Sequence, residues 1–185
     1  KYIMNKFSIL IKWAIRFTFI AVLWSYLEKL LGYHSDKISN HFSFGLIFGI
    51  VYIIIYYLTL AEVWTKVYNE NISYKSSFLN LAALTLLIAF LSPFPHLVMH
   101  NYISPEYFSN AIALSEGKTA QKLEFAKSYY TLTSFVLNGI QNTFSIGILL
   151  STIVPLAFIK RVKKNKENAQ ANTQQPTKKI KKKYQ

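Results

Sequence analysis

The sequence predicts an all-α integral membrane protein: a bundle of four transmembrane helices, short extracytoplasmic helices between the third and fourth spans, and a disordered basic C-terminal tail. The first observation behind this fold class is composition, because 52% of the 185 residues are hydrophobic and only 16% are charged, against about 25% charged in a typical soluble domain. The second is pattern: the apolar residues fall in four long blocks separated by polar stretches, as spans alternate with loops.

Each apolar block is long enough to cross a bilayer. A hydrocarbon core about 30 Å thick requires about 20 mostly apolar residues of helix, whose backbone polar groups are satisfied within the segment. The block from Phe42 to Ala61 carries no charge, and the first block carries Lys12 and Arg16 near one end and Glu28 and Lys29 near the other, which suits the two interfaces. We predict a transmembrane domain of residues 1–160 with spans at about 9–31, 42–61, 78–99 and 135–159.

The first block also allows a different interpretation, a cleavable signal peptide, because Lys6 and Lys12 precede an apolar stretch. No small-residue cleavage motif follows, and the apolar run continues to Leu31, so a retained span is the preferred interpretation. The chain has no cysteine, which excludes disulfides, iron–sulfur clusters and thiolate zinc sites.

The connection between the third and fourth spans contains helix stop and start signals. Pro93 and Pro95 are expected to end or kink the third helix, since proline lacks an N–H and clashes with the preceding turn. The Ser104–Glu106 segment offers an N-cap, a proline at the first helical position and an acid in the first turn. Gly117 is expected to end that helix and Thr119 to cap the next, which predicts a small helical layer outside the bundle.

Basic residues predict the orientation of the bundle. Of the 21 lysines and arginines, 16 lie in the N-terminal segment, the connection between spans two and three, and the tail, all on one side of the predicted bundle. Cytoplasmic loops carry the excess of basic residues, so both termini are predicted to lie in the cytoplasm.

The tail, residues 161–185, is rich in Lys, Asn and Gln and poor in apolar residues, so we predict that it is disordered. Each lysine near an anionic leaflet contributes about 1 kcal/mol of binding free energy, which predicts anionic lipid headgroups as partners. Tyr184 alone gives little aromatic support for base stacking, so specific binding to nucleic acid is not expected. The residues expected to hold the root of the tail on the membrane are Lys160, Arg161, Lys163, Lys164 and Lys166.

All four histidines, His34, His41, His96 and His100, are predicted on the outer side. His96 and His100 are four residues apart, and on a continuous helix they would share a face on which neutral imidazoles could hold a metal. The alternative is that they are interfacial residues without a metal, because Pro95 disturbs the helix that this spacing needs. We predict no metal and no other cofactor, and keep these four histidines as candidates.

Polar and small residues within the spans predict helix packing. Asn138, Gln141, Asn142 and Ser145 form one polar stripe on the fourth span, which should not face lipid and which we interpret as bonding across helices rather than lining a transport path. Gly45 and Gly49 allow close approach either to another helix of the chain or to a partner subunit. No phosphate loop, nucleophilic triad or metalloprotease motif is present, so no catalytic residue is predicted.

Four motifs, in their order and spacing, resemble the DUF4199 family of uncharacterised four-span proteins from the inner membrane of Bacteroidota. These motifs are "WSYLEKLLGYHSDKISNH" from Trp24, "SYKSSF" from Ser73, "LSPFPH" from Leu91 and "ISPEYFSN" from Ile103, within a match of about residues 7–159. The resemblance implies the bacterial inner membrane and four helices, but no reaction. His96 stands where glutamine is common in the family, which argues against an obligatory role for it.

Three functions remain open at this stage. The preferred one is a non-enzymatic subunit or scaffold that packs against partner membrane proteins. The second is an anchor or helper of a polyprenyl-phosphate or lipid-linked glycosyltransferase, because the resemblance implies such enzymes as genomic neighbours. The third is a small transporter or metal-handling protein that uses the outer histidines.

Overall fold

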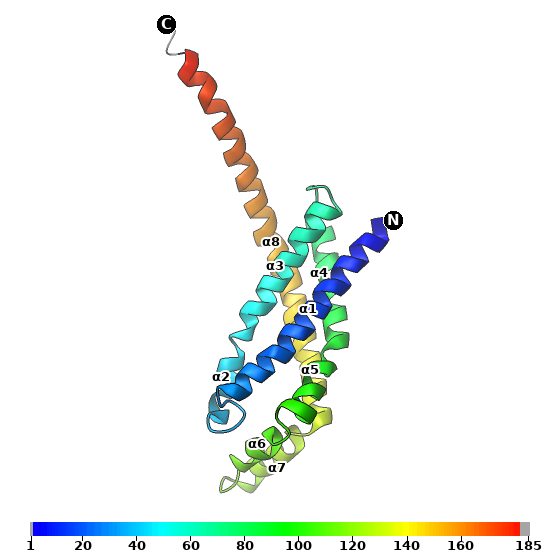
Figure 1. The fold of residues 1–185 in the computed structure, drawn as a ribbon, viewed down its shortest axis with the longest axis vertical. Helices are drawn as coiled ribbons and strands as arrows, with labels where there is room; N and C mark the ends of the chain where they lie inside the picture. Colours follow the sequence, from blue (N-terminus) through cyan, green and yellow to red (C-terminus); the bar gives the residue numbers. More distant parts are fainter. Residues whose placement is uncertain (1, 182–185) are drawn as a thin grey trace.

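The computed structural model describes residues 2–181, which form helices and connecting turns without any strand (Figure 1). Four long helical stretches run side by side, and two short helices follow the third. In chain order the elements are α1 (Tyr2–Leu30), η1 (Ile38–Asn40), α2 (His41–Gly45), α3 (Phe48–Lys66), α4 (Tyr74–Leu91), α5 (Pro93–Val98), the π-helical stretch η2 (Met99–Ile103), α6 (Tyr107–Ala113), α7 (Ala120–Tyr129) and α8 (Leu132–Lys181).

The predicted number of four spans is confirmed. Helical stretches long and apolar enough to cross a membrane run over Lys6–Leu30, Ile38–Lys66, Tyr74–Ile103 and Leu132–Asn165. They extend beyond most of the predicted limits because polar residues at the interfaces continue the helices. The protein is therefore an all-α, multi-pass membrane protein.

The core of the bundle lies where α1, α3, α4 and α8 meet. Tyr56, Leu60, Leu81 and Leu84 are fully buried there. Hydrogen bonds between buried hydroxyl groups join the helices: Tyr56 Oη lies 2.7 Å from Thr85 Oγ1, linking α3 to α4. The hydrophobic effect does not drive helices together in a membrane, because lipid tails are as apolar as the helix surfaces. Close packing and such hydrogen bonds hold the helices together instead.

The two ends of the bundle differ. The start of α1 and the C-terminal part of α8 lie at one end, and α6 and α7 lie at the other (Figure 1). A separate apolar cluster of Met99, Tyr107 and Phe108, with Tyr130 and Phe135 packed against it, fastens α6 to the bundle. The common end of the two termini agrees with an even number of spans.

The short outer helices form as predicted, with different caps. Gly117 has a φ of +78°, in the left-handed region expected of a residue that ends a helix. The Ser104 hydroxyl donates to the Glu106 carboxylate at 3.2 Å instead of accepting from a backbone N–H. Thr119 precedes α7 without a side-chain cap bond. Helix α6 starts at Tyr107, one residue after the predicted start signal.

The prolines interrupt the third span as predicted, since α4 ends at Leu91 and α5 begins at Pro93. They occupy the first turn of α5, where the missing N–H has no helical partner to lose, and the apolar stretch runs on to Ile103. The structure differs from the sequence predictions at the C-terminal end. In the tail, α8 continues as a helix through Lys181, where disorder is predicted. Lysine, alanine and glutamine are good helix formers, and extending a formed helix carries no nucleation cost. Residues 182–185 of the predicted tail lie outside the described residues.

Candidate functional site

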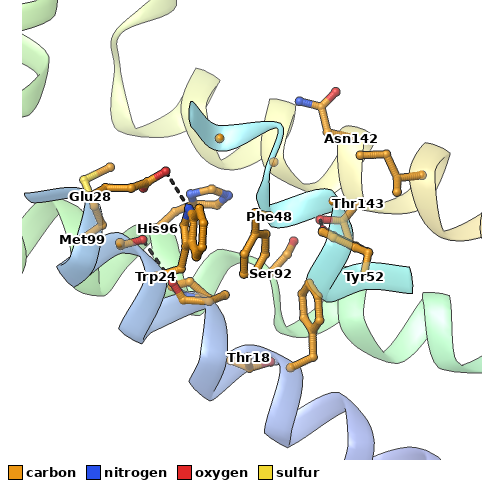
Figure 2. A pocket seen from close by; sticks show the side chains of 18 of the residues that line it. Thr18, Trp24, Glu28, Phe48, Tyr52, Ser92, His96, Met99, Asn142 and Thr143 are labelled. Carbon is orange, nitrogen blue, oxygen red and sulfur yellow. Dashed lines mark hydrogen bonds between the residues drawn. The ribbon is translucent and has the colours of Figure 1, made fainter. Parts of the chain in front are cut away.

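A cavity of about 370 Å³ lies between α1, the α2–α3 segment, α5 and α8. In Figure 2, Trp24, Glu28 and His96 lie on one side of it, and Tyr52 and Thr143 on the other. The cavity wall also includes Leu46, from the break between α2 and α3, and Ile146, from α8, and both are exposed. These two residues belong to the second and fourth spans, so part of the cavity wall is exposed within the membrane-spanning segments.

The turn after α1 brings two histidines back over Glu28. The Tyr33 N–H donates to the Glu28 carbonyl at 2.9 Å and the Gly32 N–H to the Lys29 carbonyl at 3.0 Å, which is the pairing of a Schellman motif. Gly32 has a φ of +84°, a conformation that side chains with a Cβ rarely adopt. The reversal at Gly32 places His34 beside the last turn of α1, and η1 then leads to His41.

Glu28, His34 and His41 converge in this corner of the cavity. Glu28 Oε2 lies 3.6 Å from His34 Nε2 and 3.4 Å from His41 Nε2. The side chains of Glu28 and His34 are buried, and that of His41 is partly buried. Trp24, one turn before Glu28 on α1, donates its indole N–H to Glu28 Oε1 at 2.7 Å. Trp24 thus fixes the position of Oε1, and Oε2 faces both imidazoles.

Two residues of α6 make hydrogen bonds to the two histidines. Tyr107 Oη lies 2.9 Å from His41 Nδ1, and Asn110 donates its side-chain N–H to the His34 carbonyl at 3.0 Å. Burial raises the pKa of the Tyr107 phenol, so Tyr107 keeps its proton. The outer helical layer therefore fixes the positions of His34 and His41 relative to α1.

The structure does not bring His96 and His100 to a common site. The His96 ring packs edge-on to Phe135 at 5.0 Å between ring centres, close to Gly139 of α8. The His100 ring stacks on Phe108 at 4.7 Å. Between them α5 gives way to the π-helical stretch, so the spacing of four residues does not produce a shared face. In the part of the chain that the structure describes, Glu28, His34 and His41 form one group of three possible metal ligands.

The predicted packing glycines lie on the cavity wall. No heavy atom lies within 4 Å of a Cβ added at Gly49, and the nearest atom at Gly45 is Glu28 Oε1 at 3.9 Å. Close approach within the chain occurs instead at Gly139 and Gly147 of α8. Packing of a partner subunit against Gly45 and Gly49 stays a prediction.

The predicted polar stripe of α8 faces away from the core. Gln141, Asn142 and Ser145 are exposed and Asn138 is half-buried. None of these four described side chains makes a hydrogen bond to another helix of the chain. Asn142 borders the cavity, as Figure 2 shows. The stripe is thus a polar surface within a membrane-spanning helix.

The basic residues at the root of the tail lie on the exposed surface of α8. Lys160, Arg161, Lys163 and Lys164 are exposed, and the Arg161 guanidinium lies 5.7 Å from the centre of the Tyr57 ring. The side chain of Lys166 is outside the described part of the chain. Contact of these residues with anionic lipid stays a prediction.

The grouping of Glu28 with His34 and His41 is missing from the sequence predictions, although each residue was placed on the outer side. A local signal exists: Trp24 and Glu28 are four residues apart on one helix face, and a glycine turn with two histidines follows. The direction that the chain takes after Gly32 could not be derived from that spacing. Tyr107 and Asn110 join the group only through tertiary packing.

Comparison with known protein families identifies a match. The sequence profile of a family described as "Protein of unknown function (DUF4199)" matches residues 12–161, which include all four spans nearly complete. No curated protein and no solved structure matches the chain. Since the match covers most of the sequence and confirms the resemblance, the chain belongs to the DUF4199 family.

Proposed function

We propose that the protein is a non-catalytic membrane subunit whose α8 packs against a transmembrane helix of a partner protein. The observation that supports this function is the exposed polar stripe of Gln141, Asn142 and Ser145 inside the fourth span. These residues lie 9–13 positions after Leu132, the first residue of α8, which corresponds to about 14–20 Å along the helix axis. The stripe therefore reaches well into a hydrocarbon core about 30 Å thick.

Contact between this polar stripe and lipid is unfavourable in free energy. An unsatisfied polar group in hydrocarbon costs several kcal/mol, whereas a hydrogen bond between transmembrane helices contributes about 1 kcal/mol or less. A partner helix carrying amide or hydroxyl side chains removes the penalty and adds the bonds. Amides both donate and accept, so such a helix can satisfy Gln141 and Asn142 at once.

The same face of α8 continues with apolar residues. Leu149 and Leu156 follow Ser145 at positions four and eleven residues on, and both are exposed, as is Ile153 at the edge of the face. A partner helix that crosses α8 there has polar contacts near the outer end and aliphatic contacts towards the other. This combination fits a protein partner better than a polar path for a solute, because no carboxylate or lysine lies along the stripe.

We also propose an inner-membrane location with both termini in the cytoplasm. The supporting observations are the 16 basic residues on one side of the bundle and the common end of the bundle to which both ends of the chain run (Figure 1).

Photocrosslinking tests the partner surface. The chain has no cysteine, so a single cysteine labelled with benzophenone-maleimide places one crosslinker at a chosen position. The variants Asn142→Cys and Ser145→Cys probe the stripe. Leu137→Cys and Phe144→Cys are matched controls, because both residues are exposed on α8 and neither lies three or four positions from a probe residue.

Illumination of native membranes should give a covalent product with one other membrane protein from the stripe positions and not from the controls. Mass spectrometry identifies that protein, and replacing polar groups on its helix should abolish the product. Crosslinks to lipid alone, to a second copy of the chain alone, or equally from all four positions would refute the proposed function.

A further inference from the structure

We propose that Glu28, His34 and His41 form a zinc site, with the carboxylate and two imidazole nitrogens as three protein ligands and an open fourth position. This inference is independent of the partner surface on α8. It starts from the distances between the ligand atoms, all of which lie within 4.8 Å of one another.

The two Glu28–histidine distances are longer than direct ion-pair hydrogen bonds and are close to the spacing of ligand atoms around a tetrahedral ion. A charged N–H donates to a carboxylate at about 2.7–2.9 Å, whereas Glu28 Oε2 lies 3.6 and 3.4 Å from the two Nε2 atoms. Zinc–nitrogen and zinc–oxygen bonds of about 2.0–2.1 Å at tetrahedral angles put neighbouring ligand atoms about 3.3–3.4 Å apart. An octahedral ion with bonds of about 2.1 Å would put them about 3.0 Å apart, so the two Glu28–histidine distances favour zinc over magnesium or six-coordinate iron.

The chemistry of the donors suits zinc better than calcium. Two imidazoles and one carboxylate are a ligand set that zinc accepts, and hard cations such as calcium prefer oxygen ligands alone. A buried carboxylate needs a neutralising charge close by. No lysine or arginine pairs with Glu28 among the described residues, so the charge comes either from a protonated histidine or from a bound cation.

Neighbouring groups orient two of the three ligands. Trp24 donates to Glu28 Oε1 at 2.7 Å, which leaves Oε2 directed at the histidines. If His41 carries its proton on Nδ1 and donates it to Tyr107 Oη at 2.9 Å, the lone pair of Nε2 is available to the metal. Such outer contacts commonly fix the tautomer and orientation of metal-binding histidines.

The fourth position faces the cavity. Glu28, His34 and His41 all line it, and the Cα of Gly45 leaves room beside Glu28, where an added Cβ would lie 3.9 Å from Oε1. Three protein ligands and one open position are typical of zinc sites that bind water or a further ligand. The cavity can thus supply water, or an anionic group of a molecule held there, as the fourth ligand.

The test measures metal content in the full chain, purified in mild detergent with a tag that contains no histidine. After removal of weakly held metal and reloading with zinc, the wild type should hold about one zinc per chain. Glu28→Gln, His34→Gln and His41→Gln should each lower zinc affinity by about ten-fold or more. His96→Gln and His100→Gln are the matched controls and should keep the affinity of the wild type.

A spectroscopic measurement on the wild type keeps the test independent of how the variants fold. Cobalt(II) loaded in place of zinc should give the intense visible bands of a tetrahedral ion, and zinc should displace it. Weak octahedral bands, no retained zinc in the wild type, or equal zinc loss in His100→Gln and the three ligand variants would overturn the site. The first two of these results would leave a protonated histidine as the partner of Glu28.

Discussion

Gly147 is the position at which one added methyl group should have the largest effect on stability. A Cβ at Gly147 would lie 2.5 Å from Tyr56 Oη and 2.7 Å from Thr85 Oγ1, and closer still to the Thr85 methyl group. Both neighbours are fully buried and share a hydrogen bond of 2.7 Å, so neither can swing aside into solvent. We expect Gly147→Ala to force α8 away from α4 or to break this bond.

The expected cost follows from two contributions. Overpacking a well-packed interior costs about 1–3 kcal/mol, and losing a buried hydrogen bond costs about 1 kcal/mol more. Gly147→Ala should therefore lower the free energy of unfolding by about 2–4 kcal/mol, measured by denaturant titration in detergent micelles with helix content as the signal. Gly49→Ala is the matched control, because no atom lies within 4 Å of its Cβ and alanine favours a helix by up to about 1 kcal/mol. Equal stability of the two variants would refute the close packing of α4 and α8.

Three further predictions concern other contacts. Gly139→Ala brings a Cβ to 2.6 Å from Cδ2 of His96. Because His96 is half-buried and lines the cavity, its ring can move aside, so we expect this clash to destabilise the chain less than the α4–α8 clash and to be relieved by adding His96→Ala, as the same titration would show. Ser73 accepts a hydrogen bond from a backbone N–H at the start of α4, so Ser73→Ala should cost about 1 kcal/mol, while Thr119→Ala, which removes no cap bond, should leave the unfolding midpoint unchanged. Trp24→Phe removes the indole donor to the carboxylate and should weaken zinc binding by about ten-fold, and unchanged affinity in a competition assay with a metal dye would contradict that role.

The spans were predictable because their signal is local. A charge-free run such as Phe42 to Ala61 admits few structures other than a membrane helix, and the start of α7 after Thr119 follows from turn chemistry. Helix ends were less predictable, because α8 and the third span continue past their apolar residues at little cost in free energy.

The packing face of α8 could have been predicted from a different pattern. Polar residues suggested the stripe, whereas the structure packs the face on which small or compact residues recur every fourth position. Gly147 and Ser151 are buried against α4 at that face, and this spacing permits close approach of backbones. The whole row is Gly139, Thr143, Gly147, Ser151 and Pro155.

The cluster around Glu28 could not be predicted in the same way. Its members come from a helix end, a turn and the element after it, and Tyr107 joins them from 66 residues beyond His41. Sequence spacing fixes positions along a helix but not the path of a turn such as that at Gly32.

The exposure of the cavity wall at Leu46 and Ile146, inside the second and fourth spans, has a consequence for what can occupy the cavity. A molecule that reaches the cavity from the hydrocarbon is present there at its concentration in the bilayer, which for an apolar compound greatly exceeds its concentration in water. A low affinity for the cavity is then enough for an acyl chain or another apolar compound to occupy it. Extraction with a short-chain detergent would dilute such an occupant away, so the composition of the micelle becomes a variable in any binding measurement on this protein.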